Sequence, residues 1–144
     1  MEEIRQYIVT KLGPENYGIE IGIVDNIVRM QKITRVPKVQ PYYIGVMNIR
    51  GEIIPVISLR KKLGLGEDVI TEESRILIVK PEPQANVGIL VDEVDEVVML
   101  EDKDIDYEQS KIKDANAIFL EGVGKYENKL VSILNISTIL MDKN

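Results

Sequence analysis

Cysteine, histidine and tryptophan are absent from this chain of 144 residues, and phenylalanine occurs once. Without cysteine there can be no disulfide, thiolate nucleophile or cysteine-type zinc site. Without histidine, the side chain most used for proton transfer near neutral pH is missing. Carboxylates, hydroxyls and lysines remain as possible catalytic groups. The composition therefore argues against an enzyme, and it indicates neither a cofactor nor a bound metal.

Long apolar runs are missing as well. None approaches the roughly 20 residues that cross a bilayer, and the start, MEEIRQYIVTKL, lacks the basic region and apolar core of a signal peptide. We therefore expect a cytoplasmic protein with no direct membrane insertion. The net charge of −6 and the few aromatic residues argue against nucleic-acid binding, which needs a basic surface and often aromatic platforms for stacking.

The chain nevertheless has enough apolar residues to fold, because 44% of its residues are hydrophobic. At this length it can form one compact domain over residues 1–144 or two small lobes. Its charge is uneven: residues 1–72 hold ten basic and nine acidic residues (net +1), whereas residues 73–144 hold eight and fifteen (net −7). The two halves are therefore expected to present different electrostatic surfaces.

Two segments of the chain recur. Residues 18–30, GIEIGIVDNIVRM, align with residues 88–100, GILVDEVDEVVML, at a constant offset of 70. The segment GVMNIRGEIIPVISL, from Gly45, aligns with GVGKYENKLVSILNI, from Gly122, at an offset of 77. This repetition predicts two lobes of similar plan.

Short apolar segments separated by turn residues predict an all-β fold of two small barrels related by internal duplication. The lobes are expected to span residues 1–70 and 71–144, with strands that can cross between them. Ser58 and Asn135 are candidate N-caps of short helices, and Gly64 is a candidate C-cap. Pro55 lies within a strand-like run, so that strand is expected at a sheet edge or at a bulge.

Residues 45–60 form the most informative segment, because two runs of β-branched residues flank the turn Arg50-Gly51. Gly51 can take the positive φ that a tight hairpin often requires. In the repeat, the offset of 77 aligns Arg50 with Glu127, so the hairpin itself does not require an arginine. Arginine is enriched at interface hot spots, which favours a partner-binding role over that of a solvated turn residue.

Two other candidate sites have simpler interpretations. Asp102, Asp104 and Asp106 begin like a calcium loop, but Tyr107 and Lys113 replace the glycine and glutamate that such a loop needs, so a solvated acidic turn is favoured. A second group consists of apolar residues at three- and four-residue spacing, for which packing in the core is favoured over a partner surface: Ile21, Val24, Ile27 and Val28.

The order of these segments resembles the CheW family of bacterial chemotaxis adaptors. The resemblance rests on YGIEIGIVDNIVRM with ITRVP, GVMNIRGEIIPVISLRKKLGL, VGILVDEVDEVV and LEGVGKYENKLVSILNI, and it spans nearly the whole chain. The central G-V-x-N-[LI]-R-G-x-[IV]-[IV]-P-[VI] block is its most specific part. Departures are small: Ile49 stands where leucine is commoner, and Ser58 where aspartate is commoner.

The resemblance implies two SH3-like five-stranded β-barrels and a non-catalytic adaptor that couples transmembrane chemoreceptors to the histidine kinase CheA. It implies that the kinase regulatory domain binds an apolar patch on the first barrel, and that the receptor's cytoplasmic hairpin tip binds near the inter-barrel groove. Recruitment from the cytoplasm to receptor arrays follows. The implied kinase-binding residues are Ile8, Ile21, Val24 and Ile27, and the implied receptor-binding residues are Asn48, Arg50 and Gly51.

An alternative from another class is a small-molecule-binding β-barrel or a carboxylate-based hydrolase that uses the acidic second lobe. It predicts a concave apolar pocket with converging carboxylates.

Overall fold

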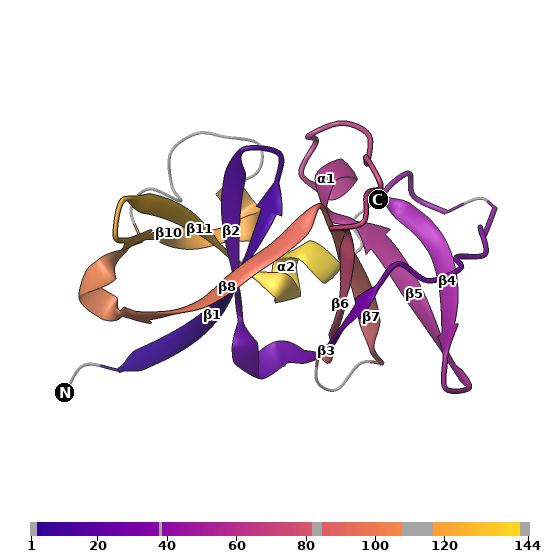
Figure 1. The fold of residues 1–144 in the computed structure, drawn as a ribbon, viewed down its shortest axis with the longest axis horizontal. Helices are drawn as coiled ribbons and strands as arrows, with labels where there is room; N and C mark the ends of the chain where they lie inside the picture. Colours follow the sequence, from indigo (N-terminus) through magenta and orange to yellow (C-terminus); the bar gives the residue numbers. More distant parts are fainter. Residues whose placement is uncertain (1–2, 38, 82–84, 108–116, 142–144) are drawn as a thin grey trace. The chain divides into compact units, whose positions relative to one another are not determined.

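The computed structural model describes residues 3–37, 39–81, 85–107 and 117–141. It is mostly β, in two sheets (Figure 1). The first sheet has the order β8-β1-β2-β11-β10-β9. Its strands are β1 (Ile4–Leu12), β2 (Glu15–Glu20), β8 (Glu93–Glu101), β9 (Ile105–Asp106), β10 (Leu120–Tyr126) and β11 (Lys129–Leu134).

The second sheet has the order β3-β6-β7-β5-β4. It comprises β3 (Val24–Arg29), β4 (Tyr43–Ile49), β5 (Glu52–Ser58), β6 (Arg75–Val79) and β7 (Val87–Val91). Five strands were expected in each lobe. The first sheet has a sixth, because the two-residue strand β9 pairs with β10 through Ile105 and Asp106.

Helices are short, as the sequence predicts, and both predicted N-caps are confirmed. Ser58 Oγ accepts from the Lys61 N–H at the start of α1 (Leu59–Lys62), and Asn135 Oδ1 accepts from the Thr138 N–H at the start of α2 (Ile136–Leu140). The C-cap of α1 is Leu63, so Gly64, the predicted C-cap, lies one residue beyond the cap, with φ 73°. The 3₁₀ helices are η1 (Ile21–Ile23), η2 (Asp102–Asp104) and η4 (Ala117–Phe119).

The chain divides into two compact units, and the division differs from the expected lobes 1–70 and 71–144. Unit 1 combines residues 1–22 with residues 95–144, whereas unit 2 spans residues 23–94. The difference arises because β1 and β2 pair with each other and β2 pairs with β11, so the N-terminal hairpin joins strands from the C-terminal half. The sequence allows for strands that cross between the lobes, but the repeat does not indicate which strands do so.

The two sheets share one arrangement of strands. In each, an antiparallel hairpin is joined by a parallel pair to a second antiparallel hairpin: β1-β2 to β11-β10, and β6-β7 to β5-β4. The parallel registers correspond as well, since Gly18 pairs with Ile133 and Gly88 pairs with Val56. Gly88 lies 70 residues after Gly18, and Ile133 lies 77 residues after Val56, which are the two offsets of the sequence repeat.

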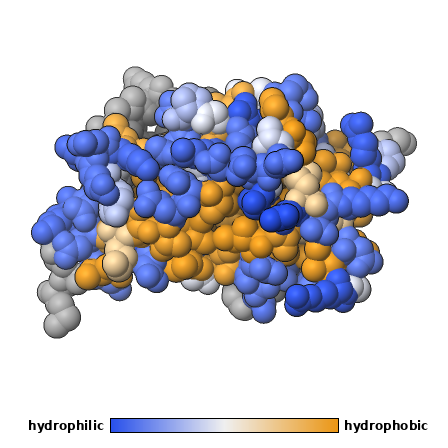
Figure 2. Space-filling view, viewed as in Figure 1, coloured by the Kyte–Doolittle hydropathy of each residue, from blue (hydrophilic) through white to orange (hydrophobic). Residues whose placement is uncertain are grey.

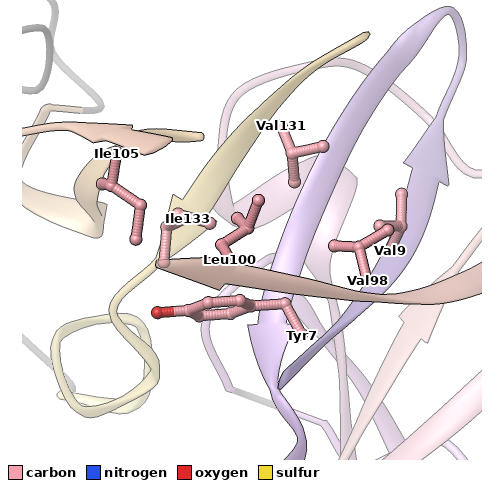
Figure 3. Packing of buried hydrophobic residues seen from close by; sticks show 7 residues of the cluster. All are labelled: Tyr7, Val9, Val98, Leu100, Ile105, Val131 and Ile133. Carbon is pink, nitrogen blue, oxygen red and sulfur yellow. The ribbon is translucent and has the colours of Figure 1, made fainter. Parts of the chain in front are cut away.

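Each unit has its own buried apolar cluster. Figure 3 shows the cluster of unit 1, where side chains from β1, β8, β9 and β11 meet. Its members are Tyr7, Val9, Val98, Leu100, Ile105, Val131 and Ile133. The cluster of unit 2 comprises Met47, Ile54, Val56, Ile76, Ile78 and Leu90.

Pro55 does not make β5 an edge strand, because β5 lies between β7 and β4. The sheet-edge alternative is therefore wrong, but the β4–β5 ladder does shift register between Tyr43 and Gly45 of β4, one pair away from Pro55. The pairing with β7 begins at Val56, so Pro55 pairs only with Val46 of β4. A proline is tolerated there because the ladder on its other side has not yet begun.

Gly45 of β4 allows a close approach of the backbone at Thr34. The N–H of Thr34 donates to the Val46 carbonyl and the N–H of Val46 donates to the Thr34 carbonyl, both at 2.8 Å. A Cβ on Gly45 would lie 2.2 Å from the Thr34 carbonyl oxygen. Glycine is therefore required at this position if the segment around Thr34 is to cover the outer edge of β4.

In the described ranges, no helix has both the length and the apolar character to span a membrane.

Candidate functional site

The hairpin between β4 and β5 closes through a two-residue turn, Arg50-Gly51, with Ile49 paired to Glu52. Arg50 has φ 52° and Gly51 has φ 85°, so both residues occupy the left-handed region that such a turn requires. The positive φ predicted for Gly51 is confirmed. The Gly51 N–H also donates to Asn48 Oδ1 at 3.0 Å, which fixes the turn from within.

The three residues assigned to receptor binding therefore differ in what they do. Asn48 and Gly51 bond to each other and hold the turn in place. Arg50 is exposed, and it makes neither an ion pair nor a hydrogen bond with any other residue that the structure describes. The hairpin thus holds one guanidinium in solvent, available for a carboxylate or an amide oxygen of a partner.

The hairpin between β10 and β11 provides a comparison within the chain. Tyr126 pairs with Lys129, and the turn residue Glu127 has φ 54°, nearly the value of Arg50. Both tips therefore impose the same backbone conformation on a non-glycine residue. Since one tip carries glutamate and the other arginine, the turn geometry does not determine the side chain.

The four residues assigned to kinase binding do not lie together on one unit. Ile8 and Ile21 belong to unit 1, and Val24 and Ile27 belong to unit 2. Ile8 is only 3% exposed, so the surface role predicted for it is corrected: it is a buried residue of β1. Its neighbours Tyr7 and Val9 are also buried, which shows that this part of β1 is covered on both faces.

Ile21, Val24 and Ile27 are not core residues, contrary to the interpretation favoured from their spacing. Ile21 starts the 3₁₀ turn η1 and is 37% exposed, and Ile27 is exposed to the same extent on the edge strand β3. Val24 is half-buried. Val28 instead packs against the apolar cluster of unit 2, because neighbouring residues of a strand point to opposite faces.

Ile21 lines a surface groove of unit 1 with a volume of about 670 Å³. Two strongly exposed apolar residues lie with it: Ile4 of β1, 59% exposed, and Met99 of β8, 62% exposed. The other lining residues are Glu3, Arg5, Gln6, Glu20 and Gly22. Figure 2 shows apolar residues gathered over β1 and β8 between hydrophilic margins. Exposed apolar residues that share one groove are typical of a docking surface.

Sequence reasoning missed Ile4 and Met99. A signal for Met99 was present in residues 97–100, VVML, because a strand that alternates faces cannot bury four consecutive apolar side chains on one face. Val98 and Leu100 are buried, and Val97 and Met99 are therefore exposed. Nothing in the sequence distinguished which alternate pair would face outward.

Carboxylates border this groove. Glu3 accepts from Arg5 Nε at 2.9 Å, and an ion pair of 2.8 Å joins Arg5 Nη2 to the same carboxylate. Burial raises the pKa of the nearby Tyr7 hydroxyl, which Figure 3 shows directed out of the apolar cluster. Loss of water around Glu121, together with the charge of Glu20, raises the pKa of Glu121. This end of unit 1 is thus acidic.

The acidic stretch from Asp92 onward has structural partners. Asp92 receives a two-pronged ion pair from Arg60, whose Nε donates at 2.8 Å and whose Nη2 contacts the other oxygen. Lys129 contacts Asp95 at 3.4 Å and Glu96 at 3.1 Å. Asp104 Oδ2 accepts from the Glu101 N–H at 2.9 Å. The carboxylates that the hydrolase alternative needs are therefore engaged in holding turns and strands.

The sequence of this chain matches one family of known proteins over nearly its whole length. The model of the family described as "CheW-like domain" matches residues 6–144. The chain is 37% identical to the chemotaxis protein CheW of Bacillus subtilis (92% of this chain, 85% of the relative). It is 36% identical to CheW of Helicobacter pylori (96% of this chain, 83% of the relative).

A solved structure is similar over nearly the same extent. The crystal structure of the scaffolding protein TtCheW from Thermoanaerobacter tengcongensis superposes with a TM-score of 0.84 at 32% identity, covering 92% of this chain and 90% of the other. The sequence match, the two-sheet fold and the motif around Arg50 thus agree, and the chain belongs to the CheW-like domain family.

Proposed function

We propose that this protein is a non-catalytic chemotaxis adaptor that couples transmembrane chemoreceptors to the histidine kinase CheA. The observation that carries the proposal is the match, over nearly the whole chain, to relatives named as chemotaxis proteins and to one solved as a scaffolding protein. Such a protein works by holding two partners at once, so that a conformational bias in one can reach the other. Its place in the cell would be the cytoplasm, at the receptor arrays of the membrane.

The receptor's cytoplasmic hairpin tip is proposed to bind at the β4–β5 hairpin through Arg50. Two observations support this assignment. Arg50 has no partner among the described residues, and its counterpart Glu127 has the same backbone conformation with the opposite charge. Asn48 and Gly51 support the site by fixing the turn, through the hydrogen bond between them.

The kinase regulatory domain is proposed to bind the groove of unit 1 through Ile21, with Ile4 and Met99 added and Ile8 removed from the sequence-based set. The exposed apolar area of these three residues supports the choice, since burying it in a complex would supply much of the binding free energy. Val24 and Ile27 on β3 remain proposed contacts of unit 2.

We also propose that the two units are SH3-like barrels that arose by internal duplication. The support is the shared strand arrangement together with the matched parallel registers, in which the offsets of 70 and 77 residues recur. The offsets differ because the connection between the two repeated segments is seven residues longer in the second copy, residues 101–121, than in the first, residues 31–44.

The kinase surface is tested by measuring the affinity for the purified CheA regulatory domain by calorimetry. Met99→Lys and Ile21→Lys should each weaken binding by tenfold or more, because each would bury an unpaired charge in the complex only. Leu130→Lys is the matched control for Met99→Lys, since Leu130 is an apolar residue of unit 1 outside the groove with nearly the same exposure, 64% against 62%. Unchanged affinity in both groove variants would refute this surface.

The receptor site is tested with a soluble receptor fragment containing the hairpin tip. Arg50→Glu should abolish its binding and leave the unfolding midpoint nearly unchanged, because Arg50 has no contact to lose within the described fold. Glu127→Arg provides the reciprocal control at the other tip and should bind normally. An equal loss of receptor binding in both variants would mean that the interaction is not specific to the β4–β5 hairpin, since the two substitutions change the net charge in opposite directions.

A further inference from the structure

Two carboxylates lie at the same end of the first sheet. Glu20 ends β2, and Glu121 is the second residue of β10. β11 lies between these strands, and its Ile133 pairs with Gly18 on one side and with Gly122 on the other. Glu20 and Glu121 both lie beyond this row of paired residues, toward the C-terminal end of β11. Their strands are separated by two strand spacings, about 10 Å.

Neither Glu20 nor Glu121 forms a salt bridge with a described residue of unit 1. Among the described residues, Arg5 is a cation whose charge reaches Glu121, and it is already bonded to Glu3. The charge of Arg5 does lower the pKa of Glu121, but loss of water and the charge of Glu20 outweigh it, and the net shift is upward. The ionised form of Glu121 is therefore less favourable in the folded chain than in the unfolded one.

The fold does not account for this arrangement. A neutral side chain at position 121 would keep the pairing of β10 and remove the unfavourable charge. A residue that costs stability and lies beside an exposed surface is a candidate for function. Glu20 supplies the surface, because it lines the groove together with Ile4, Ile21 and Met99.

We infer that the partner segment bound in this groove carries a lysine or arginine beside its apolar side chains, and that this cation binds between Glu20 and Glu121. The inference rests on the proposed function of the groove as the kinase-binding surface. The charge of unit 1 supports it: unit 1 holds eight basic and fifteen acidic residues (net −7), which favours a partner surface that carries positive charge. The apolar residues would provide affinity, and the carboxylates would provide the association rate and the orientation of the partner.

The test is the affinity of the CheA regulatory domain for the double variant Glu20→Gln/Glu121→Gln, measured at several salt concentrations. Binding should weaken by about tenfold at low salt, and its salt dependence should become shallower, because the attraction between the partners is reduced. The control is Glu15→Gln/Glu127→Gln. It removes the same charge from the first residue of β2 and from the turn residue that follows β10, at the other ends of these two strands, and should bind like the unmodified chain.

Comparison with Met99→Lys separates the two proposals. If Met99→Lys abolishes binding but the Glu20/Glu121 variant keeps the affinity and the salt dependence of the unmodified chain, the inference about the cation is wrong and the groove stands. If both double variants lose affinity equally, the effect is one of net charge and the inference is also wrong. If neither Met99→Lys nor the Glu20/Glu121 variant affects binding, the groove itself is not the docking surface.

Discussion

The hairpins β4–β5 and β10–β11 have the same backbone design and carry different side chains. Both join antiparallel strands through a two-residue turn, and both hold a non-glycine residue at a φ near 50°. One presents Arg50 and the other Glu127. The backbone requirement is shared, but the charges are opposite. The fold therefore does not determine which side chain stands at each tip, and a binding partner can.

The two units also differ in the ion pairs that each of them contains. Arg60 and Asp92 form an ion pair in unit 2. At the corresponding positions of unit 1, the offsets of 77 and 70 give Ser137 and Gly22, which cannot form one. Conversely, Lys129 links β11 to β8 in unit 1 through Asp95 and Glu96. Similar strand arrangements are therefore stabilised by different polar contacts.

The largest expected effect distinguishes two equivalent glycines. Gly45→Ala should destabilise the chain by about 3 kcal/mol or more, because the new Cβ would meet backbone atoms of Thr34 at 2.2 and 2.8 Å. Gly122→Ala should cost less, about 1–2 kcal/mol, since its shortest contacts are 2.9 Å to the Ile105 side chain and 3.0 Å to the Asp106 carbonyl oxygen, both longer than the 2.2 Å contact at Gly45. Urea denaturation of both variants measures the difference. Equal losses would contradict the special role of the Thr34 contact.

A smaller effect is expected from the ion pair that only unit 2 contains. Arg60→Met should lower the free energy of unfolding by about 1–2 kcal/mol, less than for a fully buried pair, because the two side chains are 18% and 23% exposed. Ser137→Met is the corresponding control in unit 1 and removes no ion pair. Chemical denaturation at low and high salt checks the result; a loss that does not depend on salt would indicate packing instead of charge.

The hairpin tips should respond alike in stability and differently in binding. Arg50→Asn and Glu127→Asn should each raise the free energy of unfolding by a few tenths to about 1 kcal/mol, because asparagine tolerates a positive φ better than arginine or glutamate. Thermal unfolding measures this gain. Receptor binding should be lost only in Arg50→Asn. Stabilisation of one tip alone would show that the turns are not equivalent.

The smallest effect concerns pH and Glu121. Its pKa in the folded chain is raised above the ordinary value of 4.5, so the folded state binds the proton more tightly and ionisation costs stability as the pH rises above that value. Glu121→Gln should therefore be slightly more stable than the unmodified chain at pH 7 and equal to it below pH 4.5. Glu15→Gln is the matched control. Denaturation curves across this range test the sign, which a loss of stability at pH 7 would contradict.

Several local features followed from the sequence because they depend on neighbouring residues. Ser58 and Asn135 are N-caps since each supplies a side-chain oxygen three residues before an N–H that needs an acceptor. The Arg50-Gly51 turn followed from β-branched runs on either side of a glycine. Ile8 could not be placed in this way, because whether a strand is covered on one face or both depends on residues far along the chain.

By itself, the sequence determined the mostly β character, the short capped helices, the family and the position of Arg50 at a hairpin tip. These features arise from local propensity and from a repeat whose offsets can be read in the chain. Tertiary structure decided which strands pair, and therefore that units 1 and 2 divide the chain at residues 22 and 94. It also decided that Ile4, Ile21 and Met99 share a groove with Glu20. Such groupings depend on contacts between distant segments, which no local pattern specifies.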